Sequence, residues 1–136
     1  MDVLSKEQRS YCMSRIRKTN TAPEVIVRGI VHSLGYRFRL HRRDLPGCPD
    51  IILPRYRKVI FVHGCWWHRH NCPMGRRTPK SRQAYWLPKL QGNKERDKRN
   101  RGLLRARGWR VLTLWECWTR DLERLEERIR SFLVGE

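Results

Sequence analysis

Three cysteines and one histidine place the tightest constraint on how this chain can fold. Cys65, His70 and Cys72 lie within one short segment, and Cys117 lies far along the chain, after a second apolar run. Thiolates and an imidazole are the ligands that tetrahedral Zn²⁺ prefers, and four protein ligands leave no open coordination position. The pattern therefore predicts a structural zinc site that ties a short loop to a distant part of the chain.

Two further histidines leave the ligand set open. His68 lies inside the cysteine segment, and His63 lies just before it. The spacing from Cys65 to His68 is sterically possible for a metal site, so either histidine is an alternative to His70 as the zinc ligand. A histidine that the zinc does not use could serve as a general base, because its pKa suits neutral pH.

The charge balance points to a polyanionic partner. The 136 residues include 31 Lys and Arg against 13 Asp and Glu, which gives a formal net charge of +18. A positive field attracts phosphates, and each neutralised phosphate releases counterions, so nucleic acid is the expected partner. A basic ribosomal or chromatin-type protein is the alternative interpretation.

Asp50 stands out within this basic chain. Asp44 and Asp50 are the only acidic residues between residues 25 and 94, and Asp50 opens an apolar, strand-like run. An ionised carboxylate in a positive field is a ready ligand for Mg²⁺. The alternative is that Asp50 caps the turn that follows Pro49.

The sequence favours a cytoplasmic protein. It contains no run of about 18 apolar residues, which a transmembrane helix would need, and its first residues lack the apolar core of a signal peptide. In a reducing compartment, five cysteines are expected to be thiols or metal ligands rather than disulfides. Cys12 and Cys48 have no ligand-like neighbours and are interpreted as ordinary thiols.

Hydrophobic periodicity predicts an alternation of helices and strands. The predicted order comprises a basic arm or helix at 5–18, helices at 22–34, 83–107 and 121–133, and strands at 36–40, 50–53, 58–63 and 109–116. This order indicates one α/β domain across residues 1–136, with a basic arm at 1–20 and an α/β core at 21–134. We expect a small mixed sheet with helices on both faces.

Spacing of apolar residues also predicts which helix faces are buried. A capping box formed by Thr21 and Glu24 is expected to start the first helix. The predicted inward residues are Ile26, Ile30 and Leu34 in that helix, and Leu122, Leu125, Ile129 and Leu133 in the last.

The strands at 50–53 and 58–63 are expected to pair as a hairpin about Tyr56. That register places Asp50 opposite Val62, which brings an acid beside the entrance to the cysteine segment.

Two consecutive tryptophans lie inside the cysteine segment. On an extended loop, Trp66 and Trp67 would point in opposite directions, so that one could be core and the other exposed. Exposed aromatic rings in a basic surface stack on bases or wedge between base steps, and Trp86 could join them. Ordinary core packing of the tryptophans is the alternative.

These motifs together resemble the very-short-patch repair endonuclease family. The central match covers residues 49–52 and 59–72, including the run from His63 to His68, HGCWWH. Further matches lie at 85–87, 89, 93–97 and 108–117, and near the N-terminus at 9–16 and 21–24. The similarity spans nearly the whole chain up to about residue 133.

The resemblance implies a restriction-endonuclease-like fold: a mixed β-sheet flanked by helices, with an added structural zinc. Members of the family nick duplex DNA on the 5′ side of the thymine in T:G mismatches, which arise when 5-methylcytosine deaminates. By this similarity we expect a Mg²⁺-dependent, strand-nicking DNA endonuclease that acts as a monomer on mismatched duplex DNA near the bacterial nucleoid. Other mismatch-repair proteins are expected as partners.

The resemblance also implies roles for individual residues. The positions that match zinc ligands are Cys65, His70, Cys72 and Cys117. Asp50 matches the Mg²⁺-binding acid, Val62 matches a position that offers its main-chain carbonyl to that metal, and His68 matches the catalytic histidine. The supporting active-site positions are Glu24, His63 and Asp97. The positions that match contacts with DNA are Trp66, Trp67 and Trp86 in an aromatic wedge, and Met13, Lys89 and Asn93 around the mismatched pair.

Several residues depart from the family pattern. Val62 stands where threonine is common, Trp66 replaces a common phenylalanine, and Arg69 and Asn71 replace histidines. The second acid and the lysine of restriction-type nucleases are missing, because residues 61–63 read Phe-Val-His. This absence suits a histidine-assisted mechanism.

Three other functions remain as alternatives at this point. They are a non-catalytic, zinc-stabilised DNA-binding module, a nuclease of the same fold that cuts other structures or sequences, and a basic RNA-binding protein.

Overall fold

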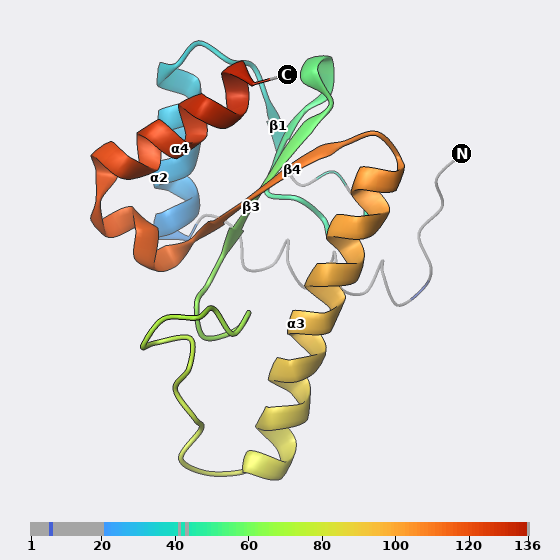
Figure 1. Cartoon of the computed structure of the whole chain (residues 1–136), viewed down its shortest axis with the longest axis vertical. Helices are drawn as coiled ribbons and strands as arrows, with labels where there is room; N and C mark the ends of the chain where they lie inside the picture. Colours follow the sequence, from blue (N-terminus) through green and yellow to red (C-terminus); the bar gives the residue numbers. More distant parts are fainter. Residues whose placement is uncertain (1–5, 7–20, 41, 43, 136) are drawn as a thin grey trace.

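A four-stranded mixed sheet forms the centre of the computed structural model (Figure 1). The structure describes residue 6, residues 21–40, residue 42 and residues 44–135. The predictions for Cys12, Met13 and the rest of the basic arm therefore lie outside the described residues. Within them, no helix is both long and apolar enough to cross a membrane.

The strand order in the sheet follows the order in the sequence. The strands are β1 (Arg39–Leu40), β2 (Ile51–Leu53), β3 (Lys58–His63) and β4 (Arg110–Trp115). The pairs β1–β2 and β2–β3 are antiparallel, whereas β3 and β4 are parallel. A parallel pair needs a crossover connection, which the helix α3 (Gln83–Ala106) supplies. The predicted strands are confirmed, although the first is shorter than expected.

The hairpin register differs from the prediction by one residue. Ile51 pairs with Ile60, so the strand continues with Asp50 opposite Phe61 rather than Val62. The connection is a short 3-10 helix, Pro54–Tyr56, followed by Arg57 in a left-handed conformation (φ 55°). This four-residue loop is not centred on Tyr56, which shifts the pairing.

Helices cover both faces of the sheet, as predicted (Figure 1). The helices α2 (Ala22–Ser33) and α4 (Leu122–Val134) pack on one face, and α3 packs on the other. Side chains alternate along β2 and β3, as the pleat requires. One face buries Val27, Val31, Ile51, Leu53, Ile60, Val62, Leu114, Leu125, Ile129 and Leu133. The other buries Leu45, Ile52, Val59, Phe61, Leu104 and Trp109.

The start of α2 differs from the predicted capping box. Thr21 is the N-cap residue, but within the described part of the chain its side chain makes no capping hydrogen bond. The Glu24 carboxylate instead pairs with Arg28, with 3.1 Å between Oε2 and Nη2. The helix buries Val27 and Val31 most deeply, while the predicted residues Ile26, Ile30 and Leu34 are only partly buried at the edge of the same cluster.

The prediction for α4 holds for three of its four leucine and isoleucine positions. Leu125, Ile129 and Leu133 are buried, but Leu122 is 56% exposed. Leu122 is the first residue of the helix and lies outside the buried cluster.

A buried lysine joins the sheet to the end of α4. Lys58 is 4% exposed, and its Nζ donates hydrogen bonds to the carbonyls of Phe132, Leu133 and Gly135 at 2.6–2.9 Å. Burial, and secondarily the charge of Arg110, lowers the pKa of Lys58. A cation at the C-terminus of a helix satisfies carbonyls that have no partner within the helix.

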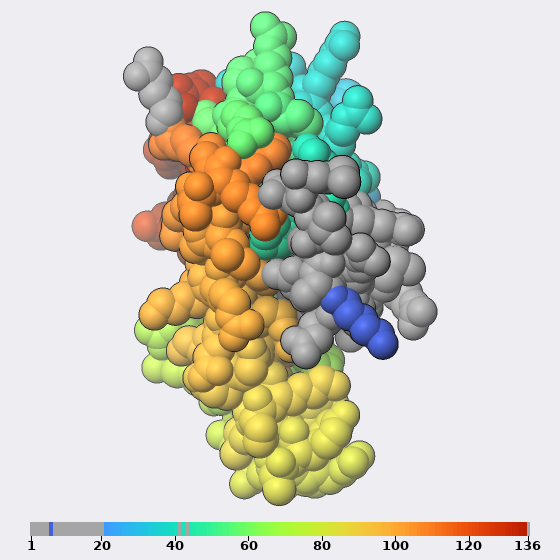
Figure 2. All heavy atoms as spheres, turned by 90° about the vertical axis from the view of Figure 1, so that its right-hand side faces the viewer, coloured from blue at the N-terminus to red at the C-terminus, as the bar shows by residue number. Residues whose placement is uncertain are grey.

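The N-terminal half of α3 extends beyond the sheet and runs beside the loop at 64–82 (Figure 1). The outer side of this helix forms much of the face seen in Figure 2. Its exposed basic residues include Lys89, Lys94, Lys98, Arg99 and Arg105. The loop and the helix together form the region that carries the candidate site.

Candidate active site and metal centre

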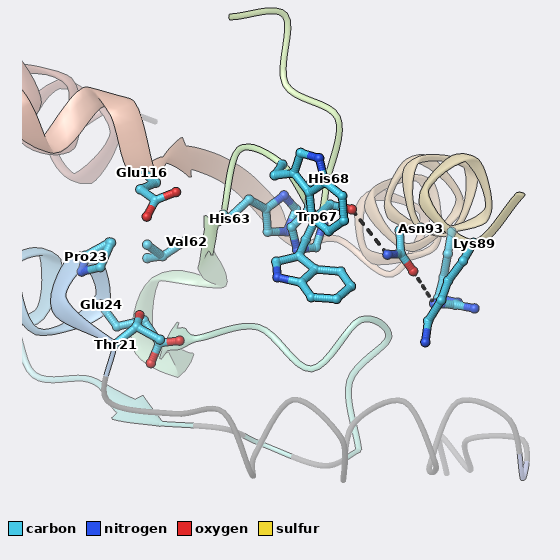
Figure 3. Close-up of a pocket in the computed structure, with 13 residues that line it drawn as sticks. Thr21, Pro23, Glu24, Val62, His63, Trp67, His68, Lys89, Asn93 and Glu116 are labelled. Atoms are coloured by element: carbon cyan, nitrogen blue, oxygen red, sulfur yellow. Dashed lines mark hydrogen bonds between the residues drawn. The ribbon is translucent and has the colours of Figure 1, made fainter. Parts of the chain in front are cut away.

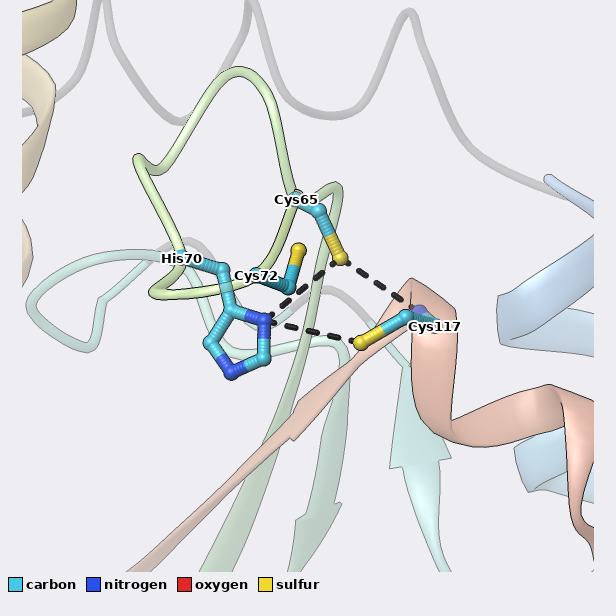
Figure 4. A group of neighbouring side chains, drawn as sticks. All are labelled: Cys65, His70, Cys72 and Cys117. Atoms are coloured by element: carbon cyan, nitrogen blue, oxygen red, sulfur yellow. Dashed lines mark hydrogen bonds between the residues drawn. The ribbon is translucent and has the colours of Figure 1, made fainter. Parts of the chain in front are cut away.

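The three cysteines and His70 meet at one end of the sheet (Figure 4). The parallel register pairs His63 with Trp115, so Cys65 and Cys117 each follow their strand by two residues and emerge side by side. The His70 Nδ1 lies 3.5 Å from the Cys117 Sγ and 3.8 Å from the Cys65 Sγ. The four ligand atoms, including the Sγ of Cys72, all lie within 4.8 Å of one another.

A series of turns brings the loop residues to the cluster. His70 N donates to the Cys65 carbonyl at 3.0 Å, and Cys72 N donates to the His70 carbonyl at 2.8 Å. Gly75 N donates to the Cys72 Sγ at 3.3 Å. A Cβ on Gly75 would lie 1.9 Å from the His70 carbonyl oxygen, so the close approach of these two backbones requires glycine.

The protonation chemistry of the cluster suits a cation. Burial raises the pKa of Cys65 to about 12 and also raises that of Cys117, because a thiolate loses its hydration when it is removed from water. Burial acts to raise the pKa of Cys72 too, but the Gly75 N–H and the neighbouring sulfurs outweigh it, and that pKa is lowered. Burial lowers the pKa of His70, which favours the neutral, ligating imidazole. The donor set fits a tetrahedral metal ion that replaces the thiol protons.

A second group of buried residues lies next to this cluster. His63 and His68 stack with 3.8 Å between ring centroids and 5° between ring planes. The His68 Nδ1 lies 2.5 Å from the Asp97 Oδ2, which joins the loop to α3. Because an ionised carboxylate only accepts hydrogen bonds, this contact assigns the proton to Nδ1 and leaves Nε2 as the basic nitrogen of the ring.

The same three side chains are close enough to hold a metal ion, but their orientation argues against one. Parallel, stacked imidazole rings direct their lone pairs side by side rather than toward a common point. In addition, Asp97 is already engaged with the His68 Nδ1. The arrangement is that of a histidine oriented by a carboxylate, which is suited to proton transfer. Of the three histidines, His70 is the one that lies in the sulfur cluster, whereas His63 and His68 lie with Asp97.

Hydrogen bonds to β3 hold Asp50 next to Val62. Its carboxylate is buried, and the Oδ2 accepts a hydrogen bond from Val62 N at 2.6 Å. Asp50 N in turn donates to the Ile60 carbonyl at 3.1 Å. Asp50 and Val62 are therefore close, as predicted. The register differs, but the Asp50 side chain reaches from the start of β2 across to the Val62 N–H of β3.

A cavity of about 530 Å³ opens in front of these residues (Figure 3). Its lining comes from α2, β3, the loop, α3 and the start of the final 3-10 turn. The lining residues are Thr21, Pro23, Glu24, Val62, His63, Gly64, Trp66, Trp67, His68, Lys89, Asn93, Arg96 and Glu116. Eight of the residues that the resemblance singled out line this cavity: Glu24, Val62, His63, Trp66, Trp67, His68, Lys89 and Asn93. Asp50, Asp97 and Trp86 are not among its lining residues.

Two charged lining residues were given no role in the sequence analysis. Glu116 lies across Val62 from Glu24 (Figure 3), and Arg96 approaches Asn93 with 3.1 Å between Nη1 and Oδ1. Glu116 immediately precedes Cys117 and follows a strand. Its position beside a predicted ligand was the signal that could have identified it.

The three tryptophans form one cluster at the rim of the cavity. Ring centroids of Trp66, Trp67 and Trp86 are 5.1–5.8 Å apart, and Trp67 is 38% exposed. The prediction that Trp66 and Trp67 point in opposite directions is wrong, because residues 64–69 form turns rather than an extended strand. The Trp86 ring packs against both of them, with centroid distances of 5.7 Å and 5.8 Å.

Two polar residues of α3 flank this aromatic cluster. Asn93 Nδ2 donates to the Trp67 carbonyl at 3.2 Å (Figure 3). The Lys89 Nζ lies 5.7 Å from the centroid of the Trp86 ring, within the range of a cation–π contact. Cation, amide and aromatic rings therefore face the same opening.

Sequence comparison identifies the family. The family described as "DNA mismatch endonuclease Vsr" matches residues 1–74. The chain belongs to this Vsr family. A type II nicking enzyme, V.XorIIP of Xanthomonas oryzae, is 54% identical over 132 residues and is covered to 96%, with 97% of the present chain aligned. The DNA mismatch endonuclease Vsr of Escherichia coli is 40% identical, with 99% of this chain and 89% of the relative aligned.

Structural comparison confirms the fold class. The catalytic domain of the homing endonuclease I-Bth0305I superimposes with a TM-score of 0.60 at 22% identity. The match covers 85% of this chain and 96% of that domain. The mixed sheet with flanking helices is thus an endonuclease fold, and membership of the Vsr family makes the chain a DNA endonuclease, a hydrolase of phosphodiester bonds.

Proposed function

We propose that this protein nicks duplex DNA on the 5′ side of the thymine in T:G mismatches, by Mg²⁺-dependent hydrolysis with a histidine general base. One observation carries the proposal. His68, which is hydrogen-bonded to the buried Asp97, lines the same cavity as Val62, and the Val62 N–H donates to the buried Asp50 carboxylate. The proposed base therefore lies in the cavity wall, and the proposed metal-binding acid is hydrogen-bonded to another residue of that wall.

The chain offers two sets of metal donors with different chemistry. Asp50 and the main-chain carbonyl of Val62 offer the oxygen donors that Mg²⁺ prefers and would hold the ion, which would supply positive charge against the scissile phosphate. Cys65, His70, Cys72 and Cys117 form a soft, complete tetrahedral set, which favours structural Zn²⁺.

His68 is the proposed base for the attacking water. Its Nε2 takes a proton from the water as the water oxygen bonds to phosphorus and one P–O ester bond breaks. The Asp97 carboxylate keeps the proton on Nδ1 and stabilises the imidazolium that forms. His63 holds the His68 ring by stacking, and Glu24 lines the far side of the cavity, where it is proposed to orient solvent.

Mismatch recognition is proposed for the rim of the cavity. Trp66, Trp67 and Trp86 would enter the base stack next to the T:G pair, whose weak pairing lowers the energy needed to open it. Lys89 and Asn93 flank the rings and would contact the mismatched pair. Met13, outside the described residues, is proposed to contact it as well. A single-strand nick needs one active centre, so the proposed state is a monomer acting at the nucleoid.

A single-turnover nicking assay tests these assignments. The substrates are a T:G duplex and the matched T:A duplex, and the variants are Asp50→Asn and His68→Ala. We expect the wild type to cleave the T:G duplex and not the T:A duplex. The cleavage rate of each variant on the T:G duplex should be lower by roughly 10²–10⁴-fold. The controls Asp44→Asn and His32→Ala remove the same groups at exposed positions outside the cavity and should leave the rate unchanged. Full activity in either site variant rejects its assigned role.

A further inference from the structure

One indole ring separates the sulfur cluster from the histidine pair. Trp115 is the last residue of β4, and its ring stacks on the His70 imidazole with 4.2 Å between centroids and 16° between planes. The same ring meets His63 edge-on at 5.3 Å and 73°. His63 in turn stacks on His68. The rings of His70, Trp115, His63 and His68 therefore form an unbroken series from the metal ligands to Asp97.

We propose that Trp115 is a positioning residue, which sets the height of the metal-held loop above the sheet so that His68 lies in register with His63 and Asp97. The inference rests on the proposed role of His68 as the base. Trp115 touches neither the reacting phosphate nor the water in this account. It acts through the imidazoles that its ring contacts, which are His70, His63 and, edge-on at 6.5 Å, His68 itself.

The sheet, and not the loop, fixes the position of the indole. Trp115 is the register partner of His63 in the parallel pair of β3 and β4. Side chains of such partners lie on the same face of a sheet. The indole therefore provides a rigid surface beside His63 on which a loop residue can rest, and the loop residue that rests there is His70.

Metal ligation alone does not determine where His68 lies. The ligands at 65, 70 and 72 bracket His68 in the sequence, but their side chains converge on a point beside it. Rotation of the loop about that point would move His68 relative to Asp97 while the ligand distances stayed the same. The flat contact between His70 and Trp115 blocks this rotation, because stacked rings resist tilting.

The catalytic consequence is expected to be large. The hydrogen bond between His68 and Asp97 is short and joins the loop to α3. A misplacement of about 1 Å in a catalytic group can cost about 100-fold in rate. Trp115→Leu removes the contacts of the indole ring with His70, His63 and His68. It is expected to lower kcat by about 100-fold.

The chain offers a matched control in Trp118. Its ring meets His70 edge-on at 6.1 Å, and Arg128 lies over it at 4.0 Å. These are its ring contacts within the described residues, and neither leads to His63 or His68. Trp118→Leu removes a half-buried tryptophan near the same ligand and is expected to cost stability without changing kcat.

The experiment compares wild type, Trp115→Leu, Trp115→Phe and Trp118→Leu in the metal-loaded form. The readouts are metal content, affinity for T:G duplex, kcat, and the proton NMR resonance of the His68 Nδ1–H. For Trp115→Leu we expect unchanged metal content, affinity within about threefold of wild type, the fall in kcat, and a broadened or shifted His68 resonance. Trp115→Phe keeps one aromatic face on His70 but withdraws from His63, so a roughly tenfold loss is expected.

Each result decides the question. Wild-type kcat and an unmoved His68 resonance in Trp115→Leu, or in Trp115→Phe should the leucine variant not fold, overturns the proposal. Loss of metal together with activity also overturns it, because Trp115 would then retain the ion instead of positioning the base. An equal fall in kcat in Trp118→Leu does the same. If wild type fails to nick T:G DNA, the proposed function fails, while the His68 resonance still tests the positioning role.

Discussion

The hairpin of β2 and β3 and the loop at 64–72 adjoin one another but owe their conformations to different forces. The strands are apolar except for Lys58 and His63 at the two ends of β3, and every residue of β2 and β3 is buried. Their side chains fill the two core clusters, so hydrophobic burial is sufficient to hold them. The loop is a series of turns whose position depends on four side chains that could hold a metal ion, a ring stack and hydrogen bonds to Asn93 and Asp97 of α3.

This difference separates stability from function within a small chain. Burial is non-directional and tolerates small errors, whereas ligation, stacking and hydrogen bonding are directional and place His68 in one orientation. The loop should therefore be able to lose its conformation while the sheet stays folded. The sheet should be able to lose stability while the folded protein keeps its nicking rate. The following predictions test that separation.

Removal of the metal should have the largest effect. A strong chelator is expected to abolish nicking of T:G duplex and to lower DNA affinity, because the loop carries both His68 and two of the tryptophans. Lower pH should promote release, since protons compete best for sulfurs whose pKa is raised, about 12 for Cys65. Circular dichroism should retain most of the helix and strand signal. Collapse of that signal together with activity would contradict the separation of loop and sheet.

Asp97→Asn should follow in size. The amide no longer fixes the proton on the His68 Nδ1, so kcat is expected to fall by roughly 10²–10⁴-fold with little change in thermal stability. Single-turnover nicking and a melting curve measure the two effects. Glu123→Gln, an exposed acid in the first turn of α4, serves as the control. A large fall in melting temperature with normal kcat would show that the pair is structural.

Leu125→Ala should act on the sheet region instead. Leu125 is fully buried between α4 and the sheet, and the cavity left behind is expected to cost about 2–5 kcal/mol of unfolding free energy. Urea denaturation measures this cost. The nicking rate at a temperature where the variant is folded should stay near wild type. Leu122→Ala, at the exposed start of the same helix, should be close to neutral.

Trp67→Ala should have the smallest effect of the four. Its ring is the most exposed of the aromatic cluster, and loss of one stacking platform is expected to cost about 1–3 kcal/mol of binding free energy. Titration of T:G and T:A duplexes at fixed salt measures the change. The loss of binding free energy should be greater for the T:G duplex than for the T:A duplex. An equal loss for both would show that Trp67 does not contribute to mismatch specificity.

Much of the fold could be predicted from the sequence, because burial leaves a periodic record. The strands at 51–53 and 58–63 and the long helix from Gln83 follow directly from apolar runs and from turn residues such as Gly108. The hairpin register could not be obtained this way. It depends on the left-handed conformation of Arg57, which has no distinct mark in the sequence.

The candidate site was less accessible to the same reasoning. Spacing left His63, His68 and His70 as competing ligands, and the choice depends on how β3 and β4 pair, which brings Cys117 beside Cys65. Residue type and spacing predicted a sulfur-rich metal site, a metal-binding Asp50 and a histidine base, but the single set of residue roles came from the family resemblance. Glu116 escaped notice because a single acid after a strand is unremarkable until the fold places it across a cavity from Glu24.

Strand-resolved cleavage of end-labelled T:G, U:G and T:A duplexes by the wild-type protein, with Mg²⁺ present, tests the central claim most directly. The account predicts one nick, in the thymine strand of the T:G duplex, immediately 5′ of the mismatched base, with the T:A duplex intact. Equal cutting of the paired duplex, cutting of both strands, or binding without any cleavage would contradict it.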